Sequence, residues 1–84
     1  MKSKTLPSFW KCFEKLPVEI QELARDKYRL WQEHPFHASL QFKEVRPGVW
    51  SIRLTQKYRA LGQENGDRIV WYWIGTHDGY DARV

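Results

Sequence analysis

Residues 69–81 of the chain read IVWYWIGTHDGYD. The first part of this stretch is apolar and aromatic, and it ends at Gly75. A short apolar run of this kind predicts a β-strand over residues 68–75 that is covered on both faces, as a central strand is. The second part is polar, and its His77 follows just beyond the predicted strand. We therefore expect a fold centred on this strand, with candidate chemical groups at its end.

The length and composition indicate one globular domain. The chain has 84 residues, of which 42% are hydrophobic and 29% are charged, so residues 1–84 have room for one modest core. Aromatic residues make up 15% of the chain, and each large ring can bury much apolar area. We expect all five tryptophans to lie in this core: Trp10, Trp31, Trp50, Trp71 and Trp73.

Several classes of protein are disfavoured by features that the sequence lacks. No apolar run approaches the roughly 20 residues of a membrane span, and the first residues, MKSKTLPSFW, lack the core of a signal peptide. The expected location is therefore the cytoplasm, with no membrane partner. Cys12 is the single cysteine, so an internal disulfide is excluded, and no Cys/His cluster has zinc spacing. We expect Cys12 to be a small buried hydrophobe and the protein to use neither a metal nor a cofactor.

The positive charge is concentrated in one part of the chain. The formal net charge is +4, and residues 40–59 hold five basic residues against the single acidic residue Glu44. The basic residues of this segment are Lys43, Arg46, Arg53, Lys57 and Arg59. Such a patch favours a polyanion as substrate or an acidic protein as partner. An ordinary solvated face is the alternative interpretation.

The N-terminal part of the chain predicts two helices. Pro7 opens a short run that stops near Leu16, and Pro17 suits the first turn of a second helix, where its missing N–H costs nothing. The pair His34-Pro35 ends this second helix because the residue before a proline avoids the α region. Apolar residues recur within it at helical spacing: Ile20, Leu23, Ala24, Tyr28 and Trp31.

The rest of the chain predicts strands. The hydrophobic period falls from about 3.6 residues to about 2, and the expected strands are residues 40–46, 49–55, 57–63 and 68–75. Pro47-Gly48 fits a type II turn, and Asn65-Gly66 indicates a two-residue hairpin. Residues 1–6 are polar and are expected to fray. The predicted fold is α+β, with an N-terminal helical hairpin packed on one face of a twisted, mostly antiparallel four-stranded sheet, whose other face is concave and basic.

Two arginines are predicted to reach one site on that second face. Arg53 and Arg59 lie on adjacent predicted strands that are joined by a tight turn. Guanidinium groups bind phosphate oxygens in a planar fork and can stabilise the added negative charge of a phosphoryl transition state. Lys43 is expected on the same face. The alternative is that each arginine pairs with a carboxylate, such as that of Glu44 or Asp78.

The polar residues after the last strand are candidates for the chemistry itself. Histidine titrates near neutral pH, so His77 can accept the proton of a ribose 2′-OH or donate one to a leaving 5′-oxygen. Tyr80 or Tyr58 could stack on an RNA base, or either could be a core ring. Asp78 and Asp81 could orient His77 or could simply be solvated. A lone loop histidine is, in general, more often structural.

These residues, taken in order, resemble the RelE/ParE toxin superfamily of bacterial type II toxin–antitoxin systems. The likeness runs through FEKLP at 13–17, the helix that ends at 34–35, and four later segments: SLQFKEV at 39–45, VWSIRL at 49–54, YRALG at 58–62 and WIGTHDGYD at 73–81. The resemblance implies the helical hairpin on a sheet. It also implies a small toxin that is neutralised by a cognate antitoxin, which wraps the basic surface.

The resemblance also implies an activity. RelE-, YoeB- and HigB-like members are endoribonucleases that cut mRNA, typically in the ribosomal A site, through attack of the 2′-OH on the adjacent phosphate. Arg53, Arg59 and His77 fall where YoeB-like members place two catalytic arginines and a histidine, and Lys43 falls on a strand that carries basic residues in other members. Tyr80 matches approximately. Leu40 stands where YoeB-like enzymes carry a glutamate, and the first strand of the family is expected to be shortened or lost.

The expected function is that of a metal-independent endoribonuclease toxin acting on mRNA at the ribosome. His77, Arg59 and Arg53 are the expected catalytic residues. The expected substrate-binding residues are Lys43, Arg46, Lys57 and Tyr80. Two alternatives remain open at this point. One is a ParE-like inhibitor that binds DNA gyrase, and the other is an inactive relative that only binds an antitoxin.

Overall fold

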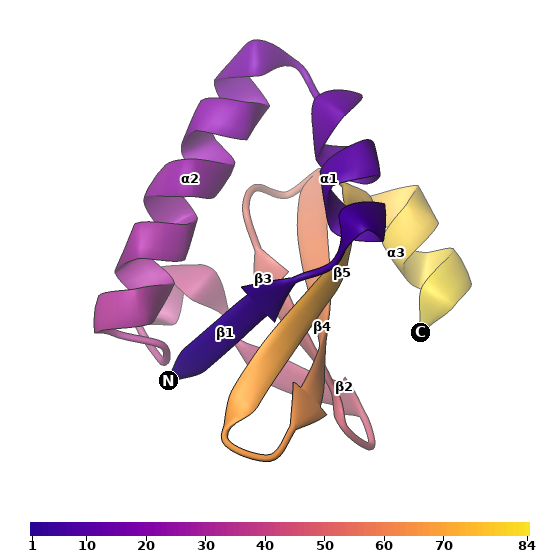
Figure 1. Ribbon diagram of the computed structural model, residues 1–84. Helices are drawn as coiled ribbons and strands as arrows, with labels where there is room; N and C mark the ends of the chain where they lie inside the picture. The colour runs from indigo at the N-terminus through magenta and orange to yellow at the C-terminus, as the bar shows by residue number, and fades with distance from the viewer.

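The fold is built around one five-stranded sheet with helices on both faces (Figure 1). A computed structural model describes all residues, 1–84. The elements in chain order are β1 (Lys2–Thr5), α1 (Pro7–Glu14), α2 (Val18–Glu33), the short 3-10 helix η1 (Ala38–Leu40), β2 (Lys43–Arg46), β3 (Val49–Arg53), β4 (Tyr58–Asn65), β5 (Arg68–Thr76) and α3 (His77–Arg83). The predicted α+β class and the N-terminal helical hairpin are confirmed.

The sheet has the strand order β1-β5-β4-β3-β2. All neighbours are antiparallel except β1, which runs parallel to β5. The prediction of four strands was therefore one strand short, because residues 1–6 do not fray. The Ser3 hydroxyl bonds the Tyr28 hydroxyl on α2, and Trp10 Nε1 on α1 donates to Thr5 Oγ1 at 2.9 Å. Backbone pairing and these two contacts stabilise a strand that has no hydrophobic pattern of its own.

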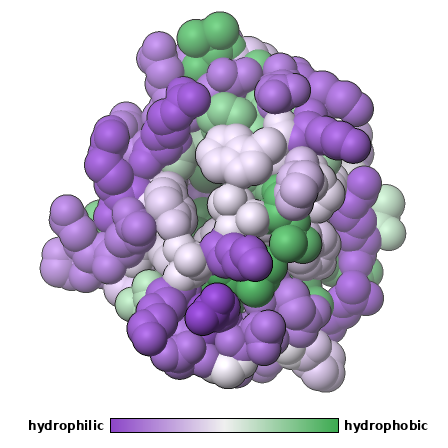
Figure 2. Space-filling view, in the orientation of Figure 1, coloured by the Kyte–Doolittle hydropathy of each residue, from purple (hydrophilic) through white to green (hydrophobic).

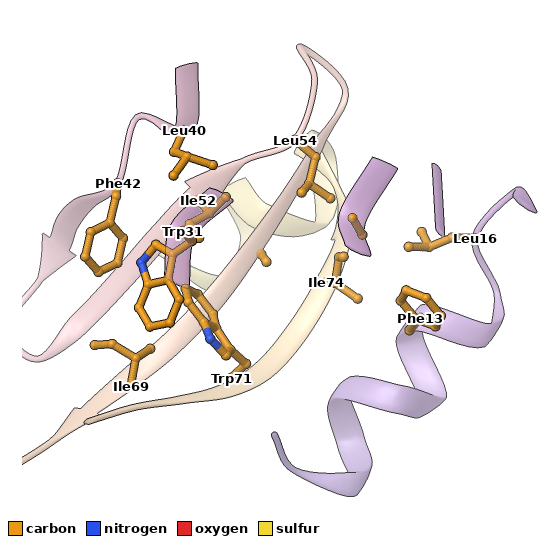
Figure 3. Packing of buried hydrophobic residues seen from close by; sticks show 12 residues of the cluster. Phe13, Leu16, Trp31, Leu40, Phe42, Ile52, Leu54, Ile69, Trp71 and Ile74 are labelled. Atoms are coloured by element: carbon orange, nitrogen blue, oxygen red, sulfur yellow. The ribbon is translucent and has the colours of Figure 1, made fainter. Parts of the chain in front are cut away.

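The larger core lies between the sheet and the hairpin of α1 and α2. Trp31 of α2 has no exposed surface, and its ring meets Trp71 and Phe42 edge-on at centroid distances of 5.3 and 5.7 Å. Figure 3 shows these rings with Ile69 beside them and Phe13 of α1 farther along the sheet. Burying a large apolar side chain contributes about 1.5–3 kcal/mol, so this cluster supplies much of the stability of the domain.

The tryptophan prediction holds for only part of the set. Trp31, Trp71 and Trp73 are buried, and Trp50 is half-buried. Trp10 is 44% exposed, so its assignment to the core was wrong. Cys12 is half-buried and packs against the core residues of both faces of the sheet.

The predicted helix ends and the turn at Pro47-Gly48 are confirmed in position, whereas the second turn lies one residue later than predicted. Pro7 is the first residue of α1, Pro17 caps α2, and α2 stops at Glu33, just before His34-Pro35. Gly48 has φ +76°, as the third residue of a type II turn after Pro47 requires. The β4–β5 hairpin also forms, but its two central residues are Gly66 and Asp67. Asn65 pairs with Arg68, and the φ of +64° at Gly66 is typical of a type II′ turn.

The last helix was not expected. Residues 77–83 form α3 on the face of the sheet opposite to α1 and α2 (Figure 1), where the sequence suggested a polar loop. The Thr76 hydroxyl caps it by accepting the Gly79 N–H at 3.5 Å. Its Tyr80 joins a small second core that also holds Val49, Leu61 and Trp73. Part of the face that we expected to be open is therefore covered by α3.

No helix of the protein combines the length and the apolar character needed to cross a bilayer.

Candidate active site

The two candidate arginines lie opposite each other on neighbouring strands. Arg53 of β3 and Arg59 of β4 are direct partners in the antiparallel ladder. Residues that alternate with them, such as Ile52 and Ala60, belong to the core under α1 and α2, so both arginines point to the face that carries α3. Side chains of direct partners start about 5 Å apart at Cβ. The sheet therefore places two guanidinium groups at one location, as the sequence predicted.

Arg59 is held without a carboxylate partner. Its Cζ atom lies 4.9 Å from the centroid of the Tyr80 ring, and its Nε and Nη1 atoms are buried with no protein acceptor. Neither arginine forms an ion pair with Glu44 or Asp78. A buried donor left unpaired costs about 1–3 kcal/mol, and like charges opposite each other in a sheet are destabilising. This pair of arginines is therefore poorly explained by stability.

His77 is positioned by the end of β5 and the start of α3. Gly75 is the ladder partner of Arg59, so His77 follows two residues beyond the arginine row. The His77 backbone N–H donates to the Lys57 carbonyl at 2.6 Å, and its Nδ1 lies 3.1 Å from a carboxylate oxygen of Asp81 one helical turn later. This contact fixes the ring and leaves Nε2 for a substrate.

Tyr80 connects the histidine to the arginines. Its ring lies 5.6 Å from the His77 ring, centroid to centroid, and the Arg59 guanidinium packs over the same ring. Tyr80 is only 9% exposed, which matches the core-ring interpretation more closely than an open stacking platform. The side chains of Arg59, Tyr80 and His77 thus form one continuous row.

The remaining basic candidates lie at different distances from this row. Lys43 pairs with Ser51 of β3, and residues 51 and 53 of a strand share one face, so Lys43 lies exposed one row from the arginines. Lys57 is exposed in the turn that precedes β4, beside the His77 backbone. Arg46 pairs with Val49, which is four residues, or about 13 Å of strand, from Arg53. Arg46 is therefore the most remote of the set.

Two residues were missed by the sequence reasoning. Ser51 is fully buried on the arginine face, and its hydroxyl has no protein partner. No sequence signal marks it, because an alternating strand gives every second residue the same appearance. Thr76 anchors α3, and with Asp78 close behind it carries a helix N-cap signal that was readable in the sequence. No three His, Cys, Asp or Glu side chains lie close enough together to hold a metal ion.

The whole fold matches solved toxins. The chain resembles the RelB-RelE antitoxin-toxin complex from Methanococcus jannaschii with a TM-score of 0.75 at 19% identity, covering 94% of this chain and 96% of that chain. It resembles a YoeB/ParE toxin from Agrobacterium tumefaciens with a TM-score of 0.70 at 22% identity, covering 92% and 99%. The isolated RelE toxin from E. coli gives 0.66 at 17% identity, covering 98% and 94%. At these identities the likeness establishes a RelE/ParE-like fold.

The family follows from the sequence match. The family model described as ParE-like toxin domain matches residues 18–82, which is most of the chain. The protein therefore belongs to the ParE-like toxin domain family, and its resemblance to the RelE/ParE superfamily of toxin–antitoxin toxins is confirmed. No curated protein sequence matches the chain.

Proposed function

We propose that the protein is an mRNA endoribonuclease toxin that acts at the ribosome and represses translation. The observation that carries this proposal is the guanidinium group of Arg59. It is buried without a protein acceptor, it lies opposite a second arginine, and it is joined through Tyr80 to His77. A protein-binding surface alone has no need of an acid–base residue beside paired arginines.

The arginines would bind the scissile phosphate. Arg59 has no carboxylate partner, and a guanidinium group binds phosphate oxygens through pairs of N–H donors. Arg53 adds a second positive charge from the opposite strand. As the ribose 2′-oxygen attacks, the phosphorus becomes five-coordinate and gains negative charge on its free oxygens. Two fixed guanidinium groups stabilise that charge more than they stabilise the bound substrate, so they lower the barrier.

His77 would move the proton. The new bond joins the 2′-oxygen to phosphorus, and the bond from phosphorus to the 5′-oxygen breaks. The 2′-OH loses a proton and the leaving 5′-oxygen gains one, so the products are a 2′,3′-cyclic phosphate end and a 5′-hydroxyl end. His77 serves one of these two transfers through Nε2, because Nδ1 is occupied by Asp81. No metal enters this scheme.

The remaining basic residues would hold the RNA strand. Lys43 and Lys57 are exposed on either side of the arginine row and are suited to neighbouring phosphates. Arg46, at the far end of β2, reaches a more distant phosphate. Tyr80 contributes by positioning Arg59 and His77, since its ring lies between them.

The proposed protein partner is a cognate antitoxin. One of the similar solved structures is an antitoxin-toxin complex, and the basic segment 40–59 of this chain suits an acidic partner. An antitoxin that covers Arg53, Arg59 and Lys43 would block RNA binding directly. The neutralised state would then need no change of conformation in the toxin.

Inhibition of DNA gyrase is the second candidate function, and the ParE-like description of the family favours it. In that case the basic face would bind the target protein and His77 would have only a structural role. A catalytically inactive relative that binds only its antitoxin would show neither activity.

The test is primer extension on mRNA in a translating extract, with and without the protein. We expect new ribosome-dependent cleavage sites with the wild-type protein, and none with His77→Ala or Arg59→Ala. Arg29→Ala is the matched control, because Arg29 lies on α2 and its ion pair is with Asp26 rather than with the candidate site, so cleavage should persist. Intact mRNA together with inhibited gyrase supercoiling would refute the nuclease and support the second candidate.

A further inference from the structure

A separate hollow lies on the other face of the sheet, enclosed by β1, α1 and α2. It has a volume of about 410 Å³, within the usual range for small-molecule sites. Its walls are mainly apolar and include Phe13, Tyr28, Trp71 and Ile74. The hollow is partly open to solvent rather than a closed void, so a small molecule can enter it without unfolding the core.

The surface over this hollow differs from its surroundings. Figure 2, in the orientation of Figure 1, shows apolar and weakly polar atoms in the middle of this face, ringed by hydrophilic residues. In Figure 3 Ile74 is drawn between Trp71 and Phe13. The hollow is thus reachable from solvent between the helices, and its inner surface is apolar.

The charges around the hollow have one sign. Arg25 and Lys27 of α2 line it, and no acidic residue does. Neither of them forms an ion pair, whereas the neighbouring Arg29 is paired with Asp26. The Arg25 guanidinium is held over the Phe13 ring, 5.0 Å from its centroid, so a fixed cation lies directly against the apolar wall.

The lining discriminates between ligands by charge. Arg25 supplies guanidinium N–H donors beside the hollow, and Trp71 contributes apolar surface. A ligand with an apolar body and oxygen acceptors would suit this lining, whereas a cationic ligand would meet Arg25 and Lys27 without any carboxylate to balance it.

We propose that this hollow binds a small amphipathic anion of the alkyl carboxylate class. The alkyl chain would lie against Phe13, Tyr28 and Trp71, and the carboxylate would pair with Arg25. The limited volume of the hollow favours a small molecule over a protein segment. The proposal is independent of RNA cleavage, because the hollow and the arginine row lie on opposite faces of the sheet.

Calorimetric titration with three probes of equal chain length tests the proposal: decanoate, decanol and decylammonium, each below its micelle-forming concentration. We expect decanoate to bind at least tenfold more tightly than decanol, to raise the thermal unfolding midpoint with concentration, and to show a negative heat-capacity change. Decylammonium should not bind. Absence of decanoate binding, or equal binding of any two probes, would overturn the proposal.

Variants separate the site from nonspecific adsorption. Arg25→Gln should weaken decanoate binding about tenfold or more and leave decanol binding unchanged. Arg29→Gln, on the same helix but outside the hollow, is the control and should bind like the wild type. Ala24→Leu fills the hollow from α2 and should abolish binding while circular dichroism shows an intact fold. Unchanged decanoate affinity in both Arg25→Gln and Ala24→Leu would also overturn the proposal.

Discussion

The two faces of the sheet are made by alternate residues of the same strands, yet they differ in how many apolar side chains they bury and in their charge. The face under α1 and α2 buries large rings such as Trp31 and Trp71 in a continuous core of twelve residues. The face under α3 has a core of four residues beside two unpaired arginines. The comparison teaches that stability is concentrated on one side. The other side can therefore carry charges that cost stability but suit an anionic substrate.

The largest effect on stability should come from truncating a buried ring on the face under α1 and α2. Trp31→Ala removes a side chain with no exposed surface and should lower the free energy of unfolding by about 3–5 kcal/mol. A domain of this size would then lose a large part of its stability. Urea titration followed by circular dichroism measures the change. Trp10→Ala is the matched control and should cost about 1 kcal/mol, since Trp10 is 44% exposed. Equal costs would contradict the assignment of stability to this face.

Replacing an arginine on the face under α3 should lower the activity of the protein without lowering its stability. Arg59→Met keeps the aliphatic stem and removes the buried unpaired donors, which stabilises the fold, but it also removes the cation–π contact with Tyr80. The first effect should exceed the second, so we expect the free energy of unfolding to rise by about 1 kcal/mol. RNA cleavage should fall by about 10²–10³-fold. Arg68→Met, with the same loss of charge at the far end of β5, should retain cleavage. A destabilised Arg59→Met variant would mean that the arginine has a structural role.

Gly62 provides a sharper probe of packing on the first face. A Cβ atom there would lie 2.4 Å from Cγ2 of Ile69 and 2.8 Å from the Trp71 ring. Gly62→Ala should therefore cost about 1–3 kcal/mol through overpacking. Chemical denaturation checks the value. A neutral result would show that β5 and its rings move easily, which a close-packed face does not allow.

The smallest effect concerns the anchoring of α3. Thr76→Ala removes the side chain that caps α3 and should cost about 1 kcal/mol. Because α3 carries His77, cleavage should fall more than global stability does, while Thr76→Ser should restore both. Amide hydrogen exchange at residues 77–83 reports the local opening directly. Equal exchange rates in the wild type and Thr76→Ala would show that the cap contributes nothing.

Most of the fold was predictable because its signals are local. The end of α2 at His34-Pro35 and the turn at Gly48 each depend on the geometry of a few neighbouring residues. The strand β1 was not predictable in this way, since it depends on pairing with β5 and on the distant Tyr28 hydroxyl. The helix α3 is short and contains Gly79, so its apolar spacing is too brief to detect.

The candidate site was predictable to a similar degree. The opposition of Arg53 and Arg59 followed from strand alternation and a tight turn. The burial of Tyr80 between Arg59 and His77 did not, because it depends on how α3 packs across the sheet. Trp10 is a residue for which the prediction from residue type was wrong, again because burial depends on how the helix packs. Its residue type favours the core, but its position on α1 leaves it 44% exposed.

The pairing of β1 with β5 has a consequence for the order of events during synthesis. The first strand to leave the ribosome has as its partner the last strand of the sheet, with Lys2 opposite Arg68. Until β5 emerges, β1 has no neighbour, the sheet lacks the strand that joins β1 to β4, and Arg59 lacks the ring of Tyr80. Contacts of such long range form late. A nascent chain therefore cannot assemble its arginine row, tyrosine and histidine before residues 77–83 have been made.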